Sequence, residues 1–356
     1  MTGRGIDQVL PHPGDPRLYE PYVTSATEYV SLAETANGPI PRPVAFSYVW
    51  GEALAELDAR QPDVRVVNLE TAVTASREPE PKGINYKMNP ENVPVLTASG
   101  VDCCVLANNH VLDWGEAGLL ETLGTLDAAG VKSAGAGRDL DEAMAPAVVP
   151  VGATARVLVF GFGAVTSGIP HGWAATQDRP GVNVLPDLSP RTLRRIARQV
   201  RAAKRPGDIV VASIHWGANW GYEIPERQTS FARGLIDDAG VDVVHGHSSH
   251  HAKAIEVYRG RPIFYGCGDF LTDYEGISGY ETFRDDLVLM YFPTLRAADG
   301  TLARLMIVPL QIRNFRLNRV SPADAAWLRD TLNREGERFG TQVQLTSGNA
   351  LTLDWG

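Results

Sequence analysis

The sequence contains only three cysteines and no hydrophobic run of the ~18 residues that a membrane-spanning helix needs. Cys103 and Cys104 are adjacent, so on a strand they point to opposite faces and cannot chelate one ion together. We interpret all three cysteines as small core residues. Residues 1–17 lack an apolar run flanked by basic residues. We therefore expect a cytoplasmic protein, unless a leader was removed before this numbering begins.

The sequence also has fewer basic residues than acidic residues. The chain has 33 Lys and Arg against 42 Asp and Glu, which gives a formal net charge of −9. This sign repels phosphate backbones and acidic membranes, so we expect no nucleic-acid partner. The 44% hydrophobic and 21% charged content is that of a globular protein and argues against disordered and fibrous classes. Nothing in the sequence indicates an oligomeric state.

Short apolar runs alternate with longer amphipathic stretches from about Val64 to Tyr265, which is the rhythm of βαβ units and predicts an α/β fold. The runs are nearly continuous in Val, Ile, Leu and Cys, a composition typical of strands buried on both faces. The predicted strands are Val64–Leu69, Asp102–Ala107, Arg156–Phe160, Asp208–Ile214, Val241–His245 and Pro262–Tyr265.

Three helices are predicted between these strands from apolar residues at helical spacing. Two of them are followed by glycine, which suits the left-handed position after a helix, and one begins with Ser-Pro. These helices are Gly115–Ala129, Ser189–Ala203 and Gln228–Ala239.

The pattern changes beyond about Arg284. Strand-like runs over Leu287–Phe292 and Ala303–Gln311 are followed by a helix from Ala323 to about Arg338 and a final short strand. We interpret residues 284–356 as an antiparallel extension that closes a single domain of residues 1–356.

Polar residues follow four of the predicted strands, at the point where each strand ends. Because ligands bind at the carboxyl ends of strands in open α/β sheets, these residues can converge although they are far apart in the chain. Six of the eight histidines lie at three of these ends, which random placement would seldom produce. The four ends carry Glu70, Asn108-Asn109-His110, His215, and Gly246 to His251.

Imidazole and carboxylate together suit zinc, manganese, iron or nickel rather than magnesium or calcium. We therefore predict one or two divalent transition metal ions as cofactors. If two ions lie close together, Glu70 could bridge them, and a bridging water would become a hydroxide near neutral pH. Asn109 then fits the role of an oxygen ligand, and His110 that of a donor to a leaving group or oxyanion.

Each feature also has a structural explanation. Glu70 alone could begin a solvated loop, His110 could cap a helix, and Asn108-Asn109 could form a turn. We interpret His245 as a core residue or a partner of a ligand rather than a ligand. His12 and His171 lie in proline-containing loops and are interpreted as surface or packing residues.

At these residues the sequence resembles the CapA-like family of poly-γ-glutamate capsule biosynthesis proteins, a branch of the calcineurin-like metallophosphoesterase superfamily. The resemblance covers roughly residues 3–315, and the ordered set of motifs is specific although each motif alone is weak. The motifs are Gly3-Arg4-Gly5, Asn68-Leu69-Glu70, Asn108-Asn109-His110, Asp113-Trp114-Gly115, Gly135-Ala136-Gly137, His215-Trp216-Gly217, Gly246-His247 to His250, and Gly266-Cys267-Gly268-Asp269-Phe270.

The resemblance implies a two-sheet α/β/β/α sandwich of the metallo-dependent phosphatase type. It places His110 in the catalytic position beside the metal. It implies metal ligands at Glu70, Asn109, His215, His247 and His250. Members of the family are named for capsule assembly or export, whereas the inherited site is that of phosphoester hydrolases.

The sequence departs from the family pattern in two places. The family opens with an apolar strand that ends in Gly-Asp, and its Asp would ligate the first metal, whereas here Met1-Thr2-Gly3-Arg4 begins just past that strand. The last motif has Ser248-Ser249 where His and Pro are usual, so either His250 or His251 could be the ligand.

Aromatic and basic residues near these motifs are candidates for substrate binding. Trp216, Trp220 and Tyr222 follow His215 directly and could hold a ring or an alkyl chain, or could simply pack the loop. Asp269 and Asp273 could be hydrogen-bond partners of the histidines. The candidate anion-binding residues are Arg4, Lys87, Arg227 and Arg284.

Three functions are compatible with the sequence. The leading hypothesis is a metal-dependent hydrolase of the phosphoesterase type, in which a metal-bound hydroxide attacks the substrate and His110 assists the leaving group. The second is an accessory protein of capsule poly-γ-glutamate synthesis or export that binds γ-glutamyl chains. The third is a metalloenzyme of a small-molecule biosynthetic pathway, for which the aromatic segment from Trp216 to Tyr222 is the only indication.

Overall fold

The computed structural model describes residues 1–356, and most of its strands lie in three sheets. The largest has seven strands in the order β10-β8-β11-β12-β14-β13, with β7 paired to β8. Its central strands are parallel, as the alternating pattern predicts. Its strands are β7 (Ala147–Val151), β8 (Ala155–Ala164), β10 (Val184–Leu185), β11 (Ile209–His215), β12 (Val243–His247), β13 (Ile255–Tyr258) and β14 (Arg261–Phe264).

A second, smaller sheet is parallel and contains β1, β4 and β5 in that order. Two further pairs of very short strands form separate two-stranded sheets. The strands are β1 (Val66–Asn68), β4 (Cys103–Val105) and β5 (Lys132–Ala134), with the pairs β2 (Ala72–Val73) and β3 (Lys87–Met88), and β6 (Ala136–Gly137) and β9 (Gly181–Val182).

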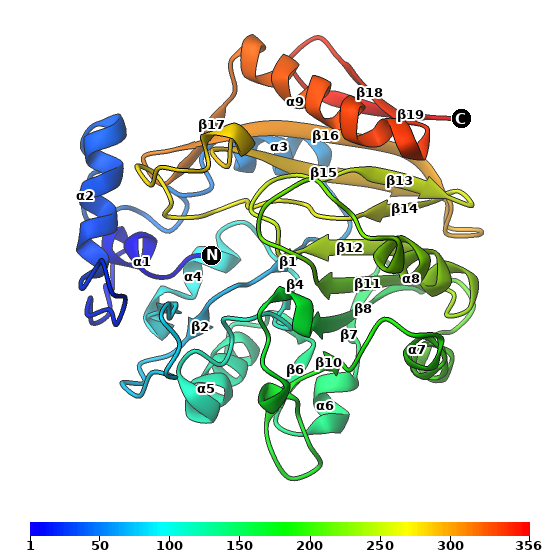
Figure 1. Cartoon of the computed structure of the whole chain (residues 1–356), viewed down its shortest axis with the longest axis horizontal. Coiled ribbons are helices and arrows are strands. Elements are labelled where there is room, and N and C mark those ends of the chain that lie inside the picture. The colour runs from blue at the N-terminus through cyan, green and yellow to red at the C-terminus, as the bar shows by residue number, and fades with distance from the viewer.

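The C-terminal residues form the third sheet, which is antiparallel and has five strands. The prediction of an antiparallel arrangement beyond residue 284 is confirmed. In Figure 1 this sheet lies above the seven-stranded sheet, and α9 covers its outer face. Its strands are β15 (Leu287–Leu295), β16 (Leu302–Arg313), β17 (Arg316–Arg319), β18 (Thr341–Leu345) and β19 (Leu351–Trp355).

Helices cover the outer faces of the sheets because each presents one apolar side. In α7, Leu193, Ile196, Ala197 and Val200 are buried at the spacing of one helical face. Its first turn is capped by Ser189, whose side chain accepts a hydrogen bond from the backbone N–H of Thr192. The helices are α1 (Gly5–Val9), α2 (Ala26–Asn37), α3 (Glu52–Arg60), α4 (Pro94–Thr97), α5 (Gly115–Ala128), α6 (Leu140–Met144), α7 (Pro190–Ala203), α8 (Glu226–Asp237) and α9 (Pro322–Gly336).

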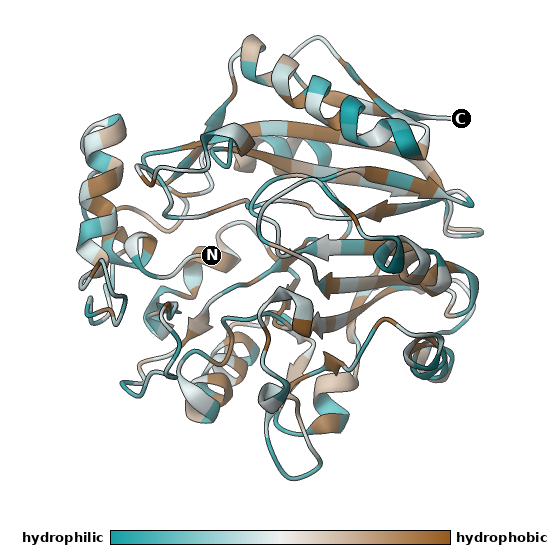
Figure 2. Cartoon of the chain, viewed as in Figure 1, coloured by the Kyte–Doolittle hydropathy of each residue, from teal (hydrophilic) through white to brown (hydrophobic).

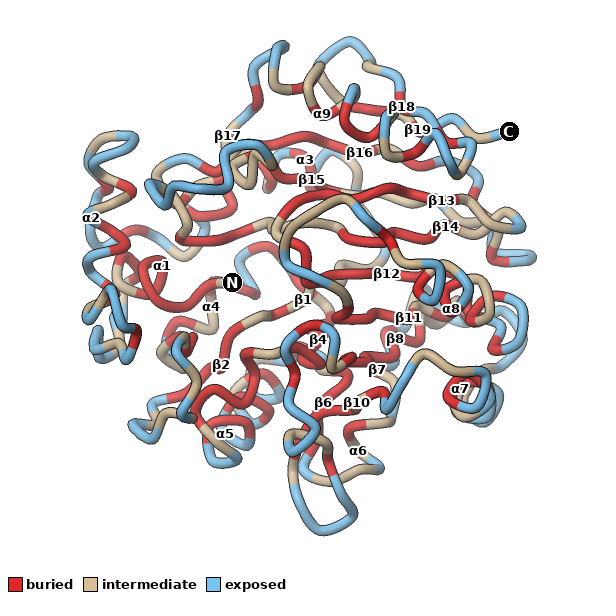
Figure 3. The backbone as a smooth tube through the Cα atoms, in the orientation of Figure 1, coloured by how far each residue is buried: buried red, intermediate tan, exposed pale blue.

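Burial follows this layering. The strands are mostly buried, while loops and the outer sides of helices are exposed (Figure 3). Hydropathy agrees, with apolar residues along β15 and β16 and polar residues on the outer turns of α7 and α9 (Figure 2). No helix combines the length and the apolar character that crossing a bilayer requires.

The mixed α/β class and every predicted strand and helix are confirmed, with ends displaced by a few residues. The largest displacement is in β8, which continues to Ala164, four residues beyond its predicted end. Gly161 lies within this extension, and a Cβ there would come within 2.7 Å of the Cα of Gly135. The helices of the first 60 residues, α1 to α3, were not predicted.

Candidate functional site

The predicted site residues follow strands of two different sheets. Glu70 lies two residues after β1, and Asn109 and His110 follow β4, both in the three-stranded sheet. His215 and His247 are the last residues of β11 and β12 in the seven-stranded sheet, where they are paired in register. The site therefore forms where the carboxyl ends of two sheets meet, rather than along the edge of one sheet.

Oxygen and nitrogen atoms from both sheets gather around His215. Its Nε2 lies 3.0 Å from the side-chain oxygen of Asn109 and 3.8 Å from Oε1 of Glu70. The Asn68 amide donates to Glu70 at 2.8 Å. Asn108 in turn donates to the side-chain oxygen of Asn68 and to the Leu69 carbonyl. These hydrogen bonds join the loops that follow β1 and β4 and hold the Glu70 carboxylate near His215.

A continuous chain of hydrogen bonds extends from His215 into the seven-stranded sheet. Nδ1 of His215 and Nδ1 of His247 are 2.8 Å apart, and Nε2 of His247 lies 3.0 Å from the Ser213 hydroxyl. The same hydroxyl is 2.8 Å from Nδ1 of His245. Because the Asn109 oxygen only accepts, His215 carries its proton on Nε2, and donation then runs from His245 through the Ser213 hydroxyl and His247 to His215. His245 thus orients His247 through the Ser213 hydroxyl.

The protonation states at the site suit a cation. Burial lowers the pKa of His215, and lowers that of His247 well below its usual value, so both imidazoles are neutral at pH 7. Burial alone would raise the pKa of Glu70, but the imidazoles of His215, His110 and His250 outweigh it and lower the pKa. The Glu70 carboxylate therefore faces the neutral imidazole of His215, and these are the forms in which both side chains bind metals.

His250, not His251, faces the site. Nδ1 of His250 lies 3.0 Å from Asp269, and this leaves Nε2 available for another partner. Burial would lower the pKa of His250, but Asp269 raises it. His251 is turned into an aromatic environment, where its ring lies 4.7 Å from that of Phe283 and its Nε2 has no hydrogen-bond partner.

His110 is supported by a buried carboxylate. Its Nδ1 is 2.6 Å from Oδ2 of Asp113, and its ring stacks on Tyr86 with ring centres 3.8 Å apart. The Lys82 ammonium donates to Asp113 at 2.7 Å and to the Asn109 carbonyl. Burial lowers the pKa of His110 well below its usual value and raises the pKa of Asp113 to about 7. In the neutral imidazole the Nδ1 proton points to Asp113, so Nε2 is a proton acceptor.

The aromatic residues after His215 have different environments. Trp216 is buried and donates from its indole to the Tyr265 carbonyl at 3.0 Å, so it packs the core. Trp220 stacks on Tyr280 with ring centres 3.9 Å apart and lies 5.2 Å from the His250 ring. Tyr222 contacts His251 from the outer side. Of the three, Trp220 is the residue that lies beside His250.

The two arginines predicted to bind substrate are engaged elsewhere. Arg4 is buried and donates to Asp273 at 2.6 and 3.0 Å and to Glu20 at 2.9 Å, between the rings of Tyr29 and Tyr86. Two carboxylates balance its single charge, so it adds no net positive charge to the site. Asp273, proposed as a partner of the histidines, is bound to Arg4.

Arg284 is likewise paired with two carboxylates. Its guanidinium donates to Asp286 at 2.8 and 3.0 Å and to Asp324 at 2.8 Å. Asp324 lies in the first turn of α9, so these contacts tie the segment before β15 to that helix. Arg284 therefore stabilises the packing of the segment before β15 against α9.

The donor atoms fit a transition metal ion by their chemistry, although they are hydrogen-bonded to one another as they lie. No group of three His, Cys, Asp or Glu side chains has the spacing to share an ion. However, the chain from His215 to His245 can reverse its direction without a change in net charge, which would free the lone pair of His215 Nε2. The Glu70 carboxylate, the Asn109 oxygen and the neutral His215 imidazole are then donors of the kinds that zinc, manganese, iron or nickel bind, while both nitrogens of His247 stay hydrogen-bonded.

Lys82 and Ser213 belong to the site but were not singled out from the sequence. Lys82 lies in the loop between β2 and β3, and Ser213 is an interior residue of β11. Neither is adjacent to a histidine in the sequence, and each becomes significant only through its contacts with Asp113 and His247. Lys82 and Ser213 could have been identified only by knowing which segments of the chain lie side by side in the fold.

Comparison with known proteins agrees with this arrangement of motifs. The family model described as "Bacterial capsule synthesis protein PGA_cap" matches residues 1–274. The chain belongs to this family. A probable polyglutamine synthesis accessory protein of Mycobacterium tuberculosis is 50% identical over 355 residues, covering 99% of this chain and 93% of the relative.

More distant relatives of this PGA_cap protein carry related names. The PGA biosynthesis protein CapA of Bacillus subtilis is 31% identical over 71% of this chain and 62% of its own length. The capsule biosynthesis protein CapA of Bacillus anthracis is 29% identical over 65% of this chain and 53% of its own length. The resemblance inferred from the motifs is therefore confirmed at the level of the family.

Proposed function

We propose that this PGA_cap protein is a metal-dependent hydrolase of phosphoesters or related electrophiles, with the fold of a metallo-dependent phosphatase. The observation that carries the proposal is the meeting of the Glu70 carboxylate, the Asn109 oxygen and the neutral His215 imidazole beside a histidine backed by a buried carboxylate. Its relatives are named for polyglutamine synthesis and PGA biosynthesis, which supports a place for this hydrolysis in the synthesis of such a polymer.

Glu70, Asn109, His215, His247 and His250 would hold one or two divalent transition metal ions. When bound, such an ion polarises the substrate and lowers the pKa of water at the site. Asp269 orients His250, and the Ser213 hydroxyl orients His247. These contacts fix the imidazole rings before a ligand arrives, which reduces the reorganisation that binding requires.

His110 would carry the proton between the attacking and leaving oxygens. Its neutral ring accepts a proton at Nε2 while Nδ1 remains bonded to Asp113. The imidazolium that results is then the donor for the leaving oxygen, so that water and a phosphoester give an alcohol and a phosphate. Asp113 stabilises this charged form and Lys82 fixes the carboxylate.

Hydrolysis of 4-nitrophenyl phosphate and bis(4-nitrophenyl) phosphate tests the proposal, measured after separate loading with Mn, Zn or Ni. We expect His110→Ala to lower kcat by about 10²–10⁴-fold while the bound metal measured by elemental analysis stays constant. His215→Ala should lower the bound metal itself. The exposed His171 provides the matched control, His171→Ala, which should retain both. Purified protein that binds none of these metals, or wild-type turnover by His110→Ala, would refute the hydrolase.

The second candidate is an accessory role that involves binding of γ-linked glutamyl chains, and the accessory role named for the Mycobacterium tuberculosis relative favours it. The charges beside the site do not favour binding of an anionic chain, because Arg4 and Lys82 are both already paired with carboxylates. Calorimetric titration with γ-glutamate oligomers separates the two candidates. Binding that His110→Ala leaves unchanged supports the accessory role, and no binding heat by either protein argues against it.

A further inference from the structure

The exposed face of α7 carries a row of arginines with no acidic residue among them. The helix contains five arginines and no Asp or Glu, in a chain whose net charge is −9. Arg191, Arg194, Arg198 and Arg201 are exposed, and their spacing keeps them on one side of a helix with about 3.6 residues per turn. The buried residues of α7 occupy the opposite side. We call these four residues the arginine stripe.

None of the four guanidiniums in the stripe is paired with a carboxylate. Arg201 donates only to the backbone carbonyl of Asp238, at 3.3 Å, and the other three side chains donate no hydrogen bond. The arginines at the surface of α9 differ, since Arg329 and Arg334 each contact the carboxylate of the residue that follows, at 2.8 Å. The stripe is therefore a concentration of uncompensated positive charge on an acidic protein.

The stripe works against the stability of its own helix. Like charges three or four residues apart on a helix repel one another, and each arginine of the stripe has such a neighbour. Of the four, only Arg201 lies at the end where the helix dipole favours a cation, while Arg191 lies in the first turn, where an acidic residue is favoured. Solvated helix faces usually mix both signs of charge. A row that lowers stability and has no partner within the chain is better explained by a ligand of opposite charge.

Two further polar side chains beside the stripe also lack partners. Nε of Arg195 and both polar atoms of the Gln199 amide are buried without a hydrogen bond. Such atoms are rare in folded proteins, because burial without a partner is costly. The charge of Arg198 acts on Arg195, so this flank of the helix adjoins the stripe. Both side chains are long enough to turn outward and donate to a ligand that lies along the stripe.

We propose that the arginine stripe binds an extended acidic polypeptide, whose carboxylates pair with the four guanidiniums. Arginine suits this ligand, because its planar fork donates two parallel hydrogen bonds to one carboxylate. From Arg191 to Arg201 the stripe is about 15 Å long, at a rise of about 1.5 Å per residue. An extended polypeptide covers that length with about five residues. A linear chain of carboxylates therefore matches the row in charge and in shape.

Other anionic partners fit the stripe less well. A membrane-binding helix inserts apolar residues, whereas Leu193, Ile196 and Val200 of α7 are buried in the core. Single-stranded nucleic acid is held by aromatic stacking as well as by charge, and α7 has no aromatic residue. Both partners would also bring negative charge to the rest of a surface whose net charge is −9. A single chain confined to the row avoids that repulsion.

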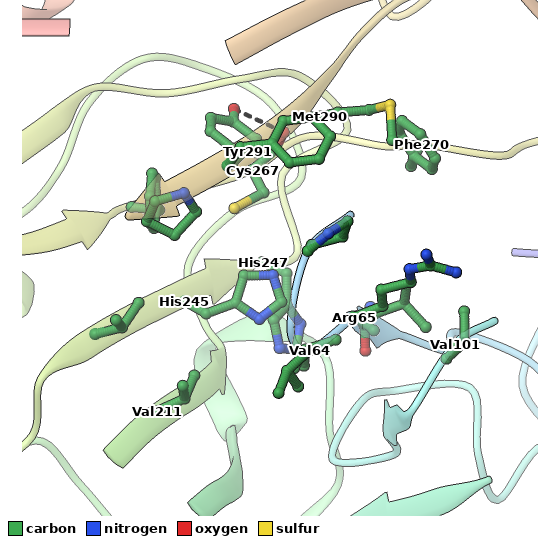
Figure 4. Close-up of a pocket in the computed structure, with 18 of the residues that line it drawn as sticks. Val64, Arg65, Val101, Val211, His245, His247, Cys267, Phe270, Met290 and Tyr291 are labelled. Carbon is green, nitrogen blue, oxygen red and sulfur yellow. Dashed lines mark hydrogen bonds between the residues drawn. The ribbon is translucent and has the colours of Figure 1, made fainter. Parts of the chain in front are cut away.

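The stripe is separate from the candidate site. No residue of α7 belongs to that site or lines the cavity of about 740 Å³ that adjoins it (Figure 4). In Figure 1 the helix lies at the lower right, on the outside of the seven-stranded sheet. Binding at the stripe therefore requires neither a metal ion nor hydrolysis, and the two proposals can fail independently.

Fluorescence anisotropy of dye-labelled deca-L-glutamate tests the proposal, with deca-L-glutamine as the neutral peptide that should not bind. We expect saturable binding of the glutamate peptide that weakens at least about tenfold in about 0.5 M NaCl, because salt screens exposed charges. Arg194→Gln/Arg198→Gln should also weaken it by at least about tenfold, since two charge-assisted contacts are lost. The matched control is Arg329→Gln/Arg334→Gln, which removes the same charge from α9 and should bind as the wild type does.

The stripe variant should also keep the wild-type Tm or exceed it, because Arg194 and Arg198 hold no side-chain hydrogen bond and repel each other. A clearly lower Tm would show that these arginines serve the fold, contrary to the proposal. His110→Ala should bind the peptide with wild-type affinity, and a loss of binding there would place the peptide at the candidate site instead.

Three binding results would overturn the proposal. They are no saturable binding of deca-L-glutamate, equal affinity of the stripe variant and the wild type, and equal weakening by the α9 control. Vesicles of phosphatidylserine and phosphatidylcholine provide the comparison with a lipid surface. Vesicle binding that is lost in Arg194→Gln/Arg198→Gln, without binding of the peptide, would assign the stripe to anionic headgroups rather than to a polypeptide.

Discussion

Replacement of Asp113 by asparagine tests the network behind His110. The Asp113 side chain is fully buried and accepts from the Tyr86 N–H at 2.6 Å, from His110 Nδ1 at 2.6 Å and from Lys82 at 2.7 Å. Asparagine retains one oxygen, but its amide NH₂ must face at least one of these three donors. The variant therefore loses a charge-assisted hydrogen bond and leaves a buried donor unpaired.

The expected loss of folding free energy is about 3 kcal/mol, since a hydrogen bond to a charged group contributes roughly 1.5–3 kcal/mol and an unpaired buried group costs roughly 1–3 kcal/mol. For 356 residues the entropy of unfolding is roughly 0.75 kcal/mol per kelvin, so Tm should fall by about 4 °C. His110 loses the partner that fixes its tautomer, and kcat on the nitrophenyl esters should fall by about 10²-fold or more.

Thermal unfolding followed by circular dichroism measures the first effect, and steady-state kinetics of the metal-loaded protein the second. Asp127→Asn, on the exposed side of α5, is the matched control and should change neither. An Asp113→Asn protein with the wild-type Tm would show that the three contacts carry no net stabilisation. A changed Tm with unchanged kcat would refute the assignment of His110 as the proton carrier.

Three further predictions follow from the contacts described above. Arg4→Met should destabilise the fold by about 3–5 kcal/mol in urea unfolding, because it leaves Asp273 and Glu20 buried without their cation; a loss below ~1 kcal/mol would contradict this. Burial lowers the pKa of His251 to about 4, against about 6.5 when unfolded, so its contribution to stability is full above pH 6.5 and is lost as the pH falls toward 4. Between pH 6.5 and 4, wild type should therefore lose about 3 kcal/mol more than His251→Phe, and parallel pH profiles would count against it. If Trp220 contacts substrate, Trp220→Ala should raise KM on the nitrophenyl esters about tenfold with little change in kcat, since a stacked aromatic contributes roughly 0.5–1.5 kcal/mol; an unchanged KM would place Trp220 in packing only.

Local patterns determined most of the secondary structure. The apolar runs that become β4, β11 and β12 and the helical spacing in α7 depend on neighbours within one element, so they can be read from the chain. The helices α1 to α3 of the first 60 residues were not predicted, and α1 has only five residues. Their position is decided by contacts with distant residues, such as that of Arg4 with Asp273.

The sequence by itself identified the polar residues at strand ends that gather in the candidate site, because such groups have no role inside a sheet, but it did not identify Lys82 and Ser213. Only the tertiary structure decided how they meet. It brought Glu70 and Asn109 to His215 across two sheets, turned His250 toward the site and His251 away, and neutralised Arg4 and Arg284 with carboxylates. The partner of a charged side chain can lie far away in the sequence, as Asp273 lies 269 residues from Arg4, and the pairing is decided only once the chain is folded.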